Sequence, residues 1–442
     1  MEFKRSKYLE RLIRNKDSSL IKVITGARRS GKSYLMNTLF YRHLLASGIS
    51  EKNIIRFAFD NDEHLDLLEP FLPEEPVKIS KPNGIYTVNA RKFRTYITTL
   101  TNDSERFVLL LDEIQLLDSF EGTLNGFLSH PNFDVYVTGS NSQMLSSEID
   151  TKFRGRKVSI HVFPLSFSEF AEDMNLSHTE AWRKYIVTGG IPIIYSLPEE
   201  EQRGYLTDLC DEVYLKDIIS RKGVKDPDTL SDLFSVLASC IGSPVSPASL
   251  ERTFRSKKNI RVTNDTINRY IESLEDAFIV SCARKYNIKG KAYINSPYKV
   301  YFEDIGVRNA RLSFRQIEET HIMENIIYNE LRYRGFSADV GTVYVNELTD
   351  RINMRGNLMY KRKELEVDFV ANDAKDRFYI QSCLNITDEE TFRRELRSLE
   401  AIPDSFRKIL ITKDGLAPRR NEDGILILDV LDFLTDPKLM YL

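Results

Sequence analysis

The chain has 442 residues, more than one ordinary hydrophobic core needs, so two or three domains are expected. Its composition, 42% hydrophobic and 29% charged with a formal net charge of −3, is that of a globular protein and excludes a chain-wide basic surface for nucleic acid or membrane. No segment resembles a signal peptide or a membrane span, and the four cysteines lie far apart, so we expect a cytoplasmic protein without a disulfide framework or a zinc site.

The stretch from residue 20 to 45 joins an apolar run to a helical pattern through a turn bracketed by glycines. It fills the pattern GxxxxGK[ST], in which backbone N–H groups turn toward phosphate, the lysine reaches the β and γ phosphates and the hydroxyl binds magnesium. The flanking "LIKVITG" and "YLMNTLFYRHLL" predict the buried strand and the helix that such a loop requires. The expected nucleotide-binding residues are Gly26, Ala27, Arg28, Arg29, Ser30, Gly31, Lys32, Ser33 and Tyr34.

Two further apolar runs, "NIIRFAF" from residue 53 and "FVLLLDEIQ" from residue 107, predict strands of the same sheet. In a parallel sheet the carboxyl ends of the strands meet at the ligand crevice. Asp112 is therefore expected to hold magnesium together with Ser33, and Glu113 is expected to polarise an attacking water. Without the preceding loop, this acidic pair would be an ordinary strand end.

The next run, "FDVYVTGSNSQML" from residue 133, places Ser140 and Asn141 at the end of another strand. Their side chains could report on a γ phosphate, or they could simply build a turn. Arg154 and Arg156 then flank a glycine on an expected loop. An arginine delivered across a subunit boundary stabilises transition-state charge, whereas a solvated surface arginine is the alternative for each.

The loop pattern is followed in order by "LLLDEIQ", "TGSNSQML", "FRGR", "FPLSFSEF" and "GGIPIIY", and together these motifs resemble a bacterial and archaeal branch of the AAA+ ATPases. The resemblance implies an α/β fold with a P-loop ATPase domain and lid over 1–205, ATP and Mg²⁺ as cofactors, and a ring, usually a hexamer, with ATP at subunit interfaces. It also implies that Asn141 senses the γ phosphate and that Arg154 or Arg156 acts on a neighbour's nucleotide. A GTPase is disfavoured, because no N-K-x-D motif follows the loop.

Residues 206–310 are expected to form a helical connector and a winged helix. Three helical patterns, the second capped by Ser246, precede two strands in winged-helix order. Between Ser246 and Val300 there are eleven Lys and Arg against five Asp and Glu, an asymmetry that favours phosphate contacts. The alternative is a module that packs on the ATPase or binds protein. The expected DNA-contact residues are Thr266, Asn268 and Arg269 on the third helix and Lys289 and Lys291 on the wing.

From residue 311 a long helix, several strands, a helix and further strands resemble the PD-(D/E)xK restriction-endonuclease-like fold, so 311–442 is an expected nuclease-like domain. Glu366 and Asp368 lie two apart on a strand and share a face. Glu324, on the preceding helix, could join them.

The catalytic E-x-K of that fold is replaced here by Gln381, Ser382 and Cys383. An amide lacks the charge that holds magnesium, and a thiol cannot supply the lysine cation. Lys361 or Lys363 could migrate into that role, but nothing in the sequence indicates it. We therefore expect an inactive nuclease-like domain. The expected vestigial site comprises Glu324, Glu366, Asp368 and Gln381.

These expectations favour an ATP-hydrolysing AAA+ protein that acts on DNA, duplex or branched, as a motor or remodeller and does not associate with membranes. One alternative is an ATP-dependent nuclease. Another is a nucleotide switch in signalling or defence that binds protein rather than DNA and hydrolyses ATP slowly.

Overall fold

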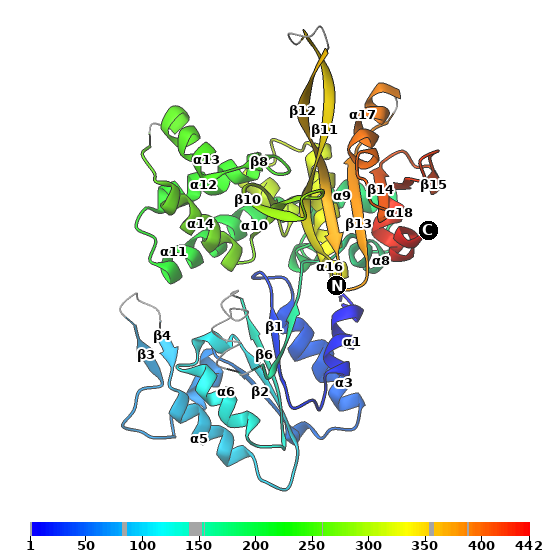
Figure 1. Ribbon diagram of the computed structural model, residues 1–442. Helices are drawn as coiled ribbons and strands as arrows, with labels where there is room; N and C mark the ends of the chain where they lie inside the picture. Colours follow the sequence, from blue (N-terminus) through cyan, green and yellow to red (C-terminus); the bar gives the residue numbers. More distant parts are fainter. Residues whose placement is uncertain are drawn as a thin grey trace. The chain divides into compact units, whose positions relative to one another are not determined.

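The computed structural model describes residues 2–81, 86–140, 153, 155–258, 260–352, 358–386 and 389–442 (Figure 1). The chain divides into two compact units. The first unit comprises Met1–Pro164, Ile191–Asp228 and Glu272–Ile279, and the second comprises Leu165–Gly190, Thr229–Ile271 and Val280–Leu442. The units group the chain differently from the consecutive segments 1–205, 206–310 and 311–442, so those domain limits stay a prediction.

The first unit is built on a parallel five-stranded sheet in the order β2-β5-β6-β1-β7. The central strands are buried along their whole length, as their continuous apolar runs predict. The strands expected before the loop and before the acidic pair are confirmed. Strand bounds are β1 Ile21–Thr25, β2 Ile54–Ala58, β5 Phe107–Asp112, β6 Phe133–Gly139 and β7 Lys157–His161.

Helices cover both faces of this sheet, with α5 and α6 on one side and α1 and α3 on the other (Figure 1). The helix expected after the glycine loop is α2, a π-helical segment η1 and α3 in succession. Strands β3 and β4 form a separate two-stranded sheet. Bounds are α1 Ser6–Arg14, α2 Lys32–Tyr34, η1 Leu35–Phe40, α3 Tyr41–Ala46, η2 Glu51–Asn53, α4 Asp62–Asp66, β3 Lys78–Ser80, β4 Tyr86–Val88, α5 Ala90–Leu100, η3 Ile114–Leu116 and α6 Phe120–Leu128.

The connector expected from residue 206 belongs to a longer helical stretch of the first unit. This stretch follows η5 and is interrupted by the π-helical segment η6. Bounds are η5 Pro192–Ser196, α10 Glu199–Asp208, η6 Leu209–Leu215 and α11 Lys216–Lys222.

The second unit contains a nine-stranded mixed sheet in the order β15-β16-β14-β13-β12-β11-β9-β10-β8. The two strands expected at 357–362 and 365–371 are one long strand, β12. It pairs with β11 along nearly its full length and extends as a two-stranded ribbon (Figure 1). Strand bounds are β8 Pro244–Val245, β9 Val280–Asn287, β10 Ala292–Phe302, β11 Ser337–Ile352, β12 Leu358–Asn372, β13 Arg377–Cys383, β14 Arg407–Thr412, β15 Arg419–Arg420 and β16 Leu426–Asp429.

The three helices and the hairpin expected of a winged helix occur in order, as α12, α13, α14, β9 and β10. Ser246 caps α13, because its hydroxyl accepts the Ser249 N–H at 3.1 Å. The hairpin is not a free wing, however. Strand β9 pairs in parallel with β11 and so continues the sheet of the C-terminal segment. Helix bounds are α8 Phe167–Asp173, α9 His178–Thr188, α12 Pro227–Ser239, α13 Pro247–Thr253, η7 Phe254–Lys258, α14 Asn264–Asp276, α15 Ile305–Arg311, α16 Glu319–Arg334, α17 Glu389–Glu400, α18 Val430–Thr435 and η8 Pro437–Tyr441.

The paired glycines of "GGIPIIY" allow two backbone segments of the second unit to approach closely. A Cβ at Gly189 would lie 2.4 Å from Asp304 Oδ1, and one at Gly190 would lie 2.3 Å from the Leu165 carbonyl oxygen. Asp304 accepts the Gly190 N–H at 2.6 Å and caps α15 through the Val307 N–H at 2.9 Å. A side chain at either glycine would break this packing.

The four cysteines are free, with Cys210 and Cys383 buried and Cys240 and Cys282 half-buried. Across the described ranges no helix combines the length and the apolar character needed to cross a bilayer.

Candidate functional site

The glycine loop between β1 and α2 has the backbone shape that its sequence predicts. Gly26 has φ +145° and Gly31 has φ +96°, and Arg29 is also left-handed at φ 65°. A Cβ at Gly26 would come within 2.2 Å of the Val162 carbonyl oxygen, so only glycine fits there. The loop is therefore packed tightly against the segment that follows β7.

Lys32 lies at the start of α2 and is 4% exposed. Its ammonium donates to the carbonyl oxygens of Gly26 at 3.0 Å and Ala27 at 2.8 Å, which holds the side chain over the loop. An ammonium above a cradle of loop backbone is the arrangement that binds β and γ phosphates. These residues fit a nucleoside triphosphate.

The carboxylate of Asp112, at the end of β5, accepts hydrogen bonds from side chains of α2, η1 and β6. Ser33 Oγ donates to its Oδ1 at 3.1 Å, and Asn37 Nδ2 donates to its Oδ2 at 3.1 Å. Thr138 on β6 also donates to Oδ1. Burial raises the pKa of Asp112, and the hydrogen bonds from Thr138 and Ser33 oppose that rise. A hydroxyl beside a buried carboxylate is a suitable pair of magnesium ligands.

Glu113 follows in a left-handed conformation, with φ 53°. Its backbone N–H donates to Thr138 Oγ1 at 3.0 Å. Its carboxylate receives hydrogen bonds from Gln115 Nε2 and, at 3.2 Å, from Ser140 Oγ. The carboxylate is thus oriented by two side chains rather than left to rotate in solvent.

A cavity of about 500 Å³ lies against this loop, within the first unit. Lys32, Ser33 and Glu113 contribute to its wall, so the expected phosphate, metal and water-polarising groups share one cavity. Its size is in the range of small-molecule sites. The remaining lining residues are Phe3, Arg5, Arg28, Arg29, Gly31, Tyr34, Asp60, Pro192, Ile193, Ser196 and Val213.

Asp60, Asn37 and Thr138 belong to this site but were not expected from the sequence. Asp60 follows β2, and burial together with the charge of Glu113 raises the pKa of its carboxyl. The signal for Asp60 was available, because a polar residue directly after a buried parallel strand lies at the ligand edge of the sheet. Asn37 and Thr138 point at Asp112 only because of the tertiary fold.

The helical connector reaches the loop directly. Arg28 forms an ion pair with Asp217 of α11, Nη2 to Oδ1 at 2.6 Å, and the Tyr214 hydroxyl donates to the Arg28 carbonyl oxygen at 3.0 Å. These two contacts connect the glycine loop to η6 and α11 of the connector. The connector therefore contacts the loop through one side chain and one backbone carbonyl group.

The arginine and sensor positions are described only in part. Asn141 and Arg154 lie outside the described residues. Arg156 precedes β7, and its Nη2 donates to Asn125 Oδ1 on α6 at 3.2 Å. Arg156 does not line the cavity beside the loop, so within one chain it is held elsewhere.

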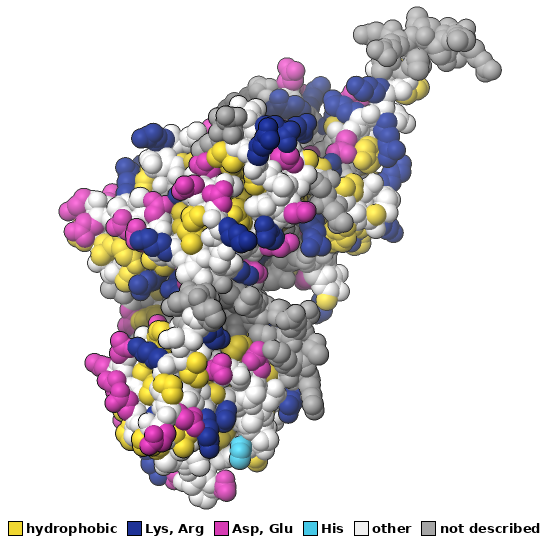
Figure 2. All heavy atoms as spheres, turned by 90° about the vertical axis from the view of Figure 1, so that its left-hand side faces the viewer, with side chains coloured by type: hydrophobic (Ala, Val, Ile, Leu, Met, Phe, Trp, Pro, Cys, Tyr) yellow, Lys and Arg dark blue, Asp and Glu magenta, His cyan; other side chains and the backbone are white. Residues whose placement is uncertain are grey.

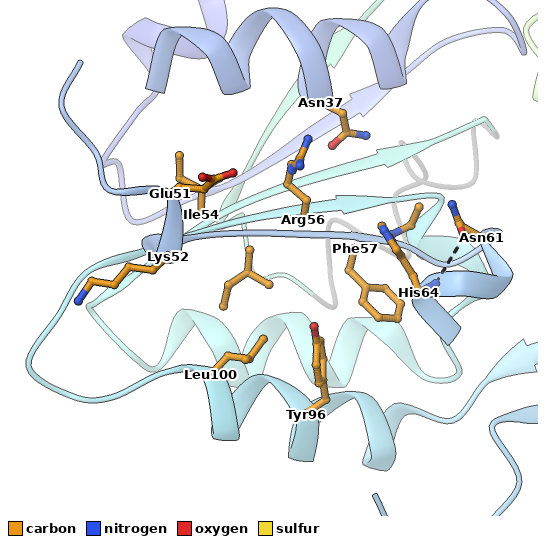
Figure 3. A pocket seen from close by; sticks show the side chains of 12 residues that line it. Asn37, Glu51, Lys52, Ile54, Arg56, Phe57, Asn61, His64, Tyr96 and Leu100 are labelled. Atoms are coloured by element: carbon orange, nitrogen blue, oxygen red, sulfur yellow. Dashed lines mark hydrogen bonds between the residues drawn. The ribbon is translucent and has the colours of Figure 1, made fainter. Parts of the chain in front are cut away.

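A second cavity, of about 720 Å³, runs along β2 at the edge of the sheet (Figure 3). Tyr96 and Leu100 of α5 line one side, and Asn37 lines the other (Figure 3). Asn37 therefore contacts Asp112 and also lines a cavity open to the edge of the sheet.

The expected DNA-contact residues are accessible. Asn268 and Arg269 are exposed on α14, and Arg269 Nη2 donates to the half-buried Thr266 hydroxyl at 3.2 Å. Lys289 and Lys291 are exposed in the turn between β9 and β10. Four of the five expected side chains are thus exposed, on the helix and in the turn.

The second unit brings together the expected acids Glu324, Glu366 and Asp368, from α16 and β12. Between them lies Lys299 of β10, which the sequence analysis did not single out. Its signal was a lysine inside the apolar run "YKVYF", which predicts a buried and paired charge. Lys361 and Lys363 are exposed on the ribbon, and Lys363 pairs with Glu347 at 3.1 Å.

The charges in this cluster shift one another. Burial raises the pKa of Asp368 to about 7, the charge of Glu324 adds to the rise, and Lys299 and Ser382 oppose it. Burial alone would lower the pKa of Lys299, but the charges of Asp368, Glu324 and Glu366 raise it instead. The lysine is therefore held as an ammonium.

A sequence relative decides the family. An uncharacterized protein of Haemophilus influenzae is 31% identical over 438 residues, covering 97% of this chain and 98% of the relative. The chain belongs to the family of this protein. An uncharacterized protein of Methanocaldococcus jannaschii is 27% identical over 410 residues, which are 89% of this chain and 80% of that protein.

Two family models match parts of the chain. Residues 18–171 match an AAA domain, and residues 179–318 match a domain of unknown function (DUF8612). The match to the AAA domain spans the glycine loop, the acidic pair and Arg156, and it confirms the AAA part of the resemblance. The winged-helix and nuclease-like parts remain predictions.

Solved structures show weaker likeness. The Aeropyrum pernix ORC1 protein, solved in complex with DNA, is 14% identical with a TM-score of 0.30, over 71% of this chain and 93% of that one. The Aeropyrum pernix ORC2 protein is 11% identical with a TM-score of 0.35, over 73% of this chain and 92% of that one. At these identities and TM-scores, what those proteins bind is not evidence of what this chain binds.

Proposed function

We propose that this AAA-domain protein binds Mg-ATP at the glycine loop and hydrolyses it. The observation that carries the proposal is the convergence of Lys32, Ser33 and Glu113 on one cavity, with Asp112 hydrogen-bonded to Ser33 directly behind it. Bound magnesium would supply Lewis-acid charge stabilisation at the phosphates.

Each group then has a defined task. The loop N–H groups and the Lys32 ammonium bind phosphate, and Ser33 and Asp112 hold the metal. Glu113, positioned by Gln115 and Ser140, orients the attacking water and accepts its proton. Asn141 is proposed to sense the γ phosphate, and the domain with its lid is proposed to span 1–205.

We further propose that the protein assembles into a ring, with a hexamer as the expected size. The Asn125 amide, which now accepts from Arg156, is a neutral partner that a phosphate would outcompete. Arg156, or Arg154 beside it, would then act on the nucleotide of a neighbouring subunit. Turnover would in that case depend on protein concentration.

The proposed target is DNA, duplex or branched, on which the protein acts as a motor or remodeller. Over most of the face shown in Figure 2, Lys and Arg are interspersed with Asp and Glu. Because the formal net charge of the chain is −3, a basic surface for DNA must be local. The segment from Ser246 to Val300 has eleven basic residues, but Lys299 and Lys285 are paired with carboxylates outside it. Nine basic residues against five acidic ones remain, and Arg269, Lys289 and Lys291 are exposed among them.

In this proposal the helices α12 to α14 and the hairpin act as a winged helix within 206–310, and 311–442 is a nuclease-like domain that does not cleave. Motion would pass from the loop through Arg28 and Asp217 into the connector.

The test is the ATPase rate with and without duplex, single-stranded and branched DNA at two salt concentrations. We expect DNA to stimulate turnover and the stimulation to fade as salt rises, since phosphate contacts release counterions. Replacing Arg269, Lys289 and Lys291 by alanine should reduce the salt slope by about one for each phosphate that is no longer neutralised. Lys375→Ala, which removes an exposed lysine from the turn between β12 and β13, is the matched control.

The alternatives make different predictions. A nucleotide switch that binds protein would show the same slow turnover with every DNA. A nuclease would cut plasmid in Mg²⁺ or Mn²⁺ and lose that activity in Asp368→Ala.

A further inference from the structure

Strand β10 inserts a lysine into the carboxylate cluster of the second unit. The Lys299 ammonium lies 2.8 Å from Glu324 Oε1, 2.7 Å from Glu366 Oε1 and 3.4 Å from Asp368 Oδ1. Lys299 is 2% exposed, Glu324 6% and Asp368 7%. A buried cation thus contacts all three acids of the expected vestigial site.

The oxygens of the two most buried acids are also hydrogen-bonded to other groups. The Tyr301 hydroxyl donates to Glu324 Oε1 at 2.6 Å, the same oxygen that Lys299 contacts. Asp368 Oδ2 accepts both the backbone N–H and the hydroxyl of Ser382 at 2.8 Å. These donors and the lysine thus contact Glu324 Oε1, Glu366 Oε1 and both oxygens of Asp368.

The positions that replace the E-x-K motif do not complete a metal site. Gln381 Oε1 accepts the Asp368 backbone N–H at 3.2 Å, and Gln381 Nε2 donates to Glu395 Oε2 at 3.0 Å. The Cys383 thiol donates to the Asn385 carbonyl oxygen at 3.1 Å. Neither side chain supplies a ligand or a cation to the cluster.

A divalent ion does not fit between these carboxylates, because the Lys299 ammonium occupies that position. Magnesium needs oxygens at about 2.0–2.1 Å in octahedral geometry, whereas here the space between the carboxylates holds an ammonium at hydrogen-bond distance. Within the described residues no group of three or more His, Cys, Asp or Glu is arranged to hold a metal. The cluster is a lysine-centred ion network.

We propose that Lys299 is the resident cation of this site, in the place that a divalent metal takes in a working nuclease, and that removing its charge opens a metal site. The proposal rests on the nuclease-like interpretation of 311–442 given above. The network also fastens the β9–β10 hairpin to α16 and β12, so one lysine both closes the site and anchors the hairpin in the sheet.

The test measures Mn²⁺ binding by electron paramagnetic resonance on the full-length chain without nucleotide. All variants carry Asp112→Asn, which removes the carboxylate of the loop site. In this background we expect no bound Mn²⁺ with Lys299 present, one Mn²⁺ per chain in Lys299→Met, and loss of that ion when Asp368→Asn is added. Lys285→Met is the matched control, because Lys285 on β9 pairs with one carboxylate, Glu364, and its loss should create no site.

Two results would overturn the proposal. One is Mn²⁺ bound in the Asp112→Asn background with Lys299 intact and released by Asp368→Asn. The other is a folded Lys299→Met protein that gains no ion. If Lys299→Met does not fold, Lys299→Gln, which also removes the charge, takes its place in the same measurement. None of these results depends on ATP turnover, so failure here is distinguishable from failure of the proposed function.

Discussion

Ser33 Oγ donates a hydrogen bond to Asp112 Oδ1 over 3.1 Å, although 79 positions separate the two residues in the chain. The contact places the first residues of the helix after the glycine loop against the end of the strand that carries the acidic pair. It brings together the two proposed magnesium ligands from motifs that the sequence shows far apart.

Replacing Asp112 by asparagine should abolish the magnesium-dependent step and leave the fold intact. We expect ATP turnover to fall by roughly 100-fold or more, because the metal supplies several kcal/mol of transition-state stabilisation. The thermal midpoint should fall slightly, because the new amide has only one acceptor oxygen and loses part of the hydrogen bonds from Ser33, Thr138 and Asn37, although it also removes a buried charge. ATPase rates across a magnesium titration measure the first effect, and melting curves measure the second. An unchanged magnesium dependence in Asp112→Asn would show that Asp112 does not hold the metal.

Gly26→Ala should destroy ATP binding. Its Cβ would meet the Val162 carbonyl oxygen at 2.2 Å, and its φ of +145° is a conformation that alanine avoids. The matched control is Gly126→Ala on α6, where no heavy atom lies within 4 Å of the new Cβ and helix propensity should add up to about 1 kcal/mol. Fluorescent-nucleotide titration compares the two variants. Normal binding by Gly26→Ala would contradict the tight packing of the loop.

The sequence was sufficient for the first unit because local chemistry and topology agree there. A glycine loop between a buried strand and a helix, and an acidic pair after another such strand, allow few arrangements in a parallel sheet. The hydrogen bonds that Asn37 and Thr138 donate to Asp112, and that Gln115 donates to Glu113, were not predictable. They depend on how the strands and helices are placed relative to one another in the fold.

Lys22 and Asp134 form an ion pair buried inside the first unit, with exposures of 0% and 1%. Burial lowers the pKa of Lys22, and Asp134 opposes that shift. Removing one partner, in Lys22→Met or Asp134→Asn, should cost about 3–5 kcal/mol, and the double variant should cost less than the sum of the two. Urea unfolding followed by circular dichroism measures these costs.

Fluorescence in the same experiment separates the two units. The only tryptophan of the chain, Trp182, is buried in the second unit, and its indole N–H donates to Glu319 Oε1 at 2.7 Å. Its transition should not move in the Lys22 and Asp134 variants. If the free-energy costs of Lys22→Met and Asp134→Asn simply add up in the double variant, the two residues do not stabilise each other.

Asp304 should make the stability of the second unit depend on pH. Burial raises the pKa of its carboxyl to about 6, and the hydrogen bonds from the backbone N–H groups of Gly190 and Val307 oppose that rise. The native state therefore holds a proton that the unfolded chain releases at lower pH. Its stabilising effect is complete below about pH 4, is lost as pH rises through 6, and amounts to about 3 kcal/mol.

Asp304→Asn should remove that dependence, because an amide does not titrate in this range. Its single oxygen can accept only one of the two N–H groups, which different carboxylate oxygens accept in the wild type, so the variant should be less stable overall. From pH 4 to pH 7 the Trp182 melting temperature of the wild type should fall relative to the variant. Parallel curves for the two proteins across this range would contradict the assignment.

The second unit was harder to predict because its key contacts join distant segments. The hairpin of β9 and β10 was expected as the wing of a winged helix. The sequence shows only two strands and a turn there, so the parallel pairing of β9 with β11, which joins the hairpin to the sheet, was not predictable. That pairing brings Lys299 to acids on α16 and β12, a contact visible only in three dimensions. The acids themselves were predictable from their spacing.

We propose that the glycine loop binds and hydrolyses ATP, and this is tested most directly by measuring nucleotide binding and turnover side by side in wild type, Lys32→Ala and Glu113→Gln. We expect turnover in the wild type, loss of binding in Lys32→Ala, and retained binding with turnover lost in Glu113→Gln. Normal hydrolysis by Glu113→Gln, or a wild-type protein that binds no ATP, would contradict it.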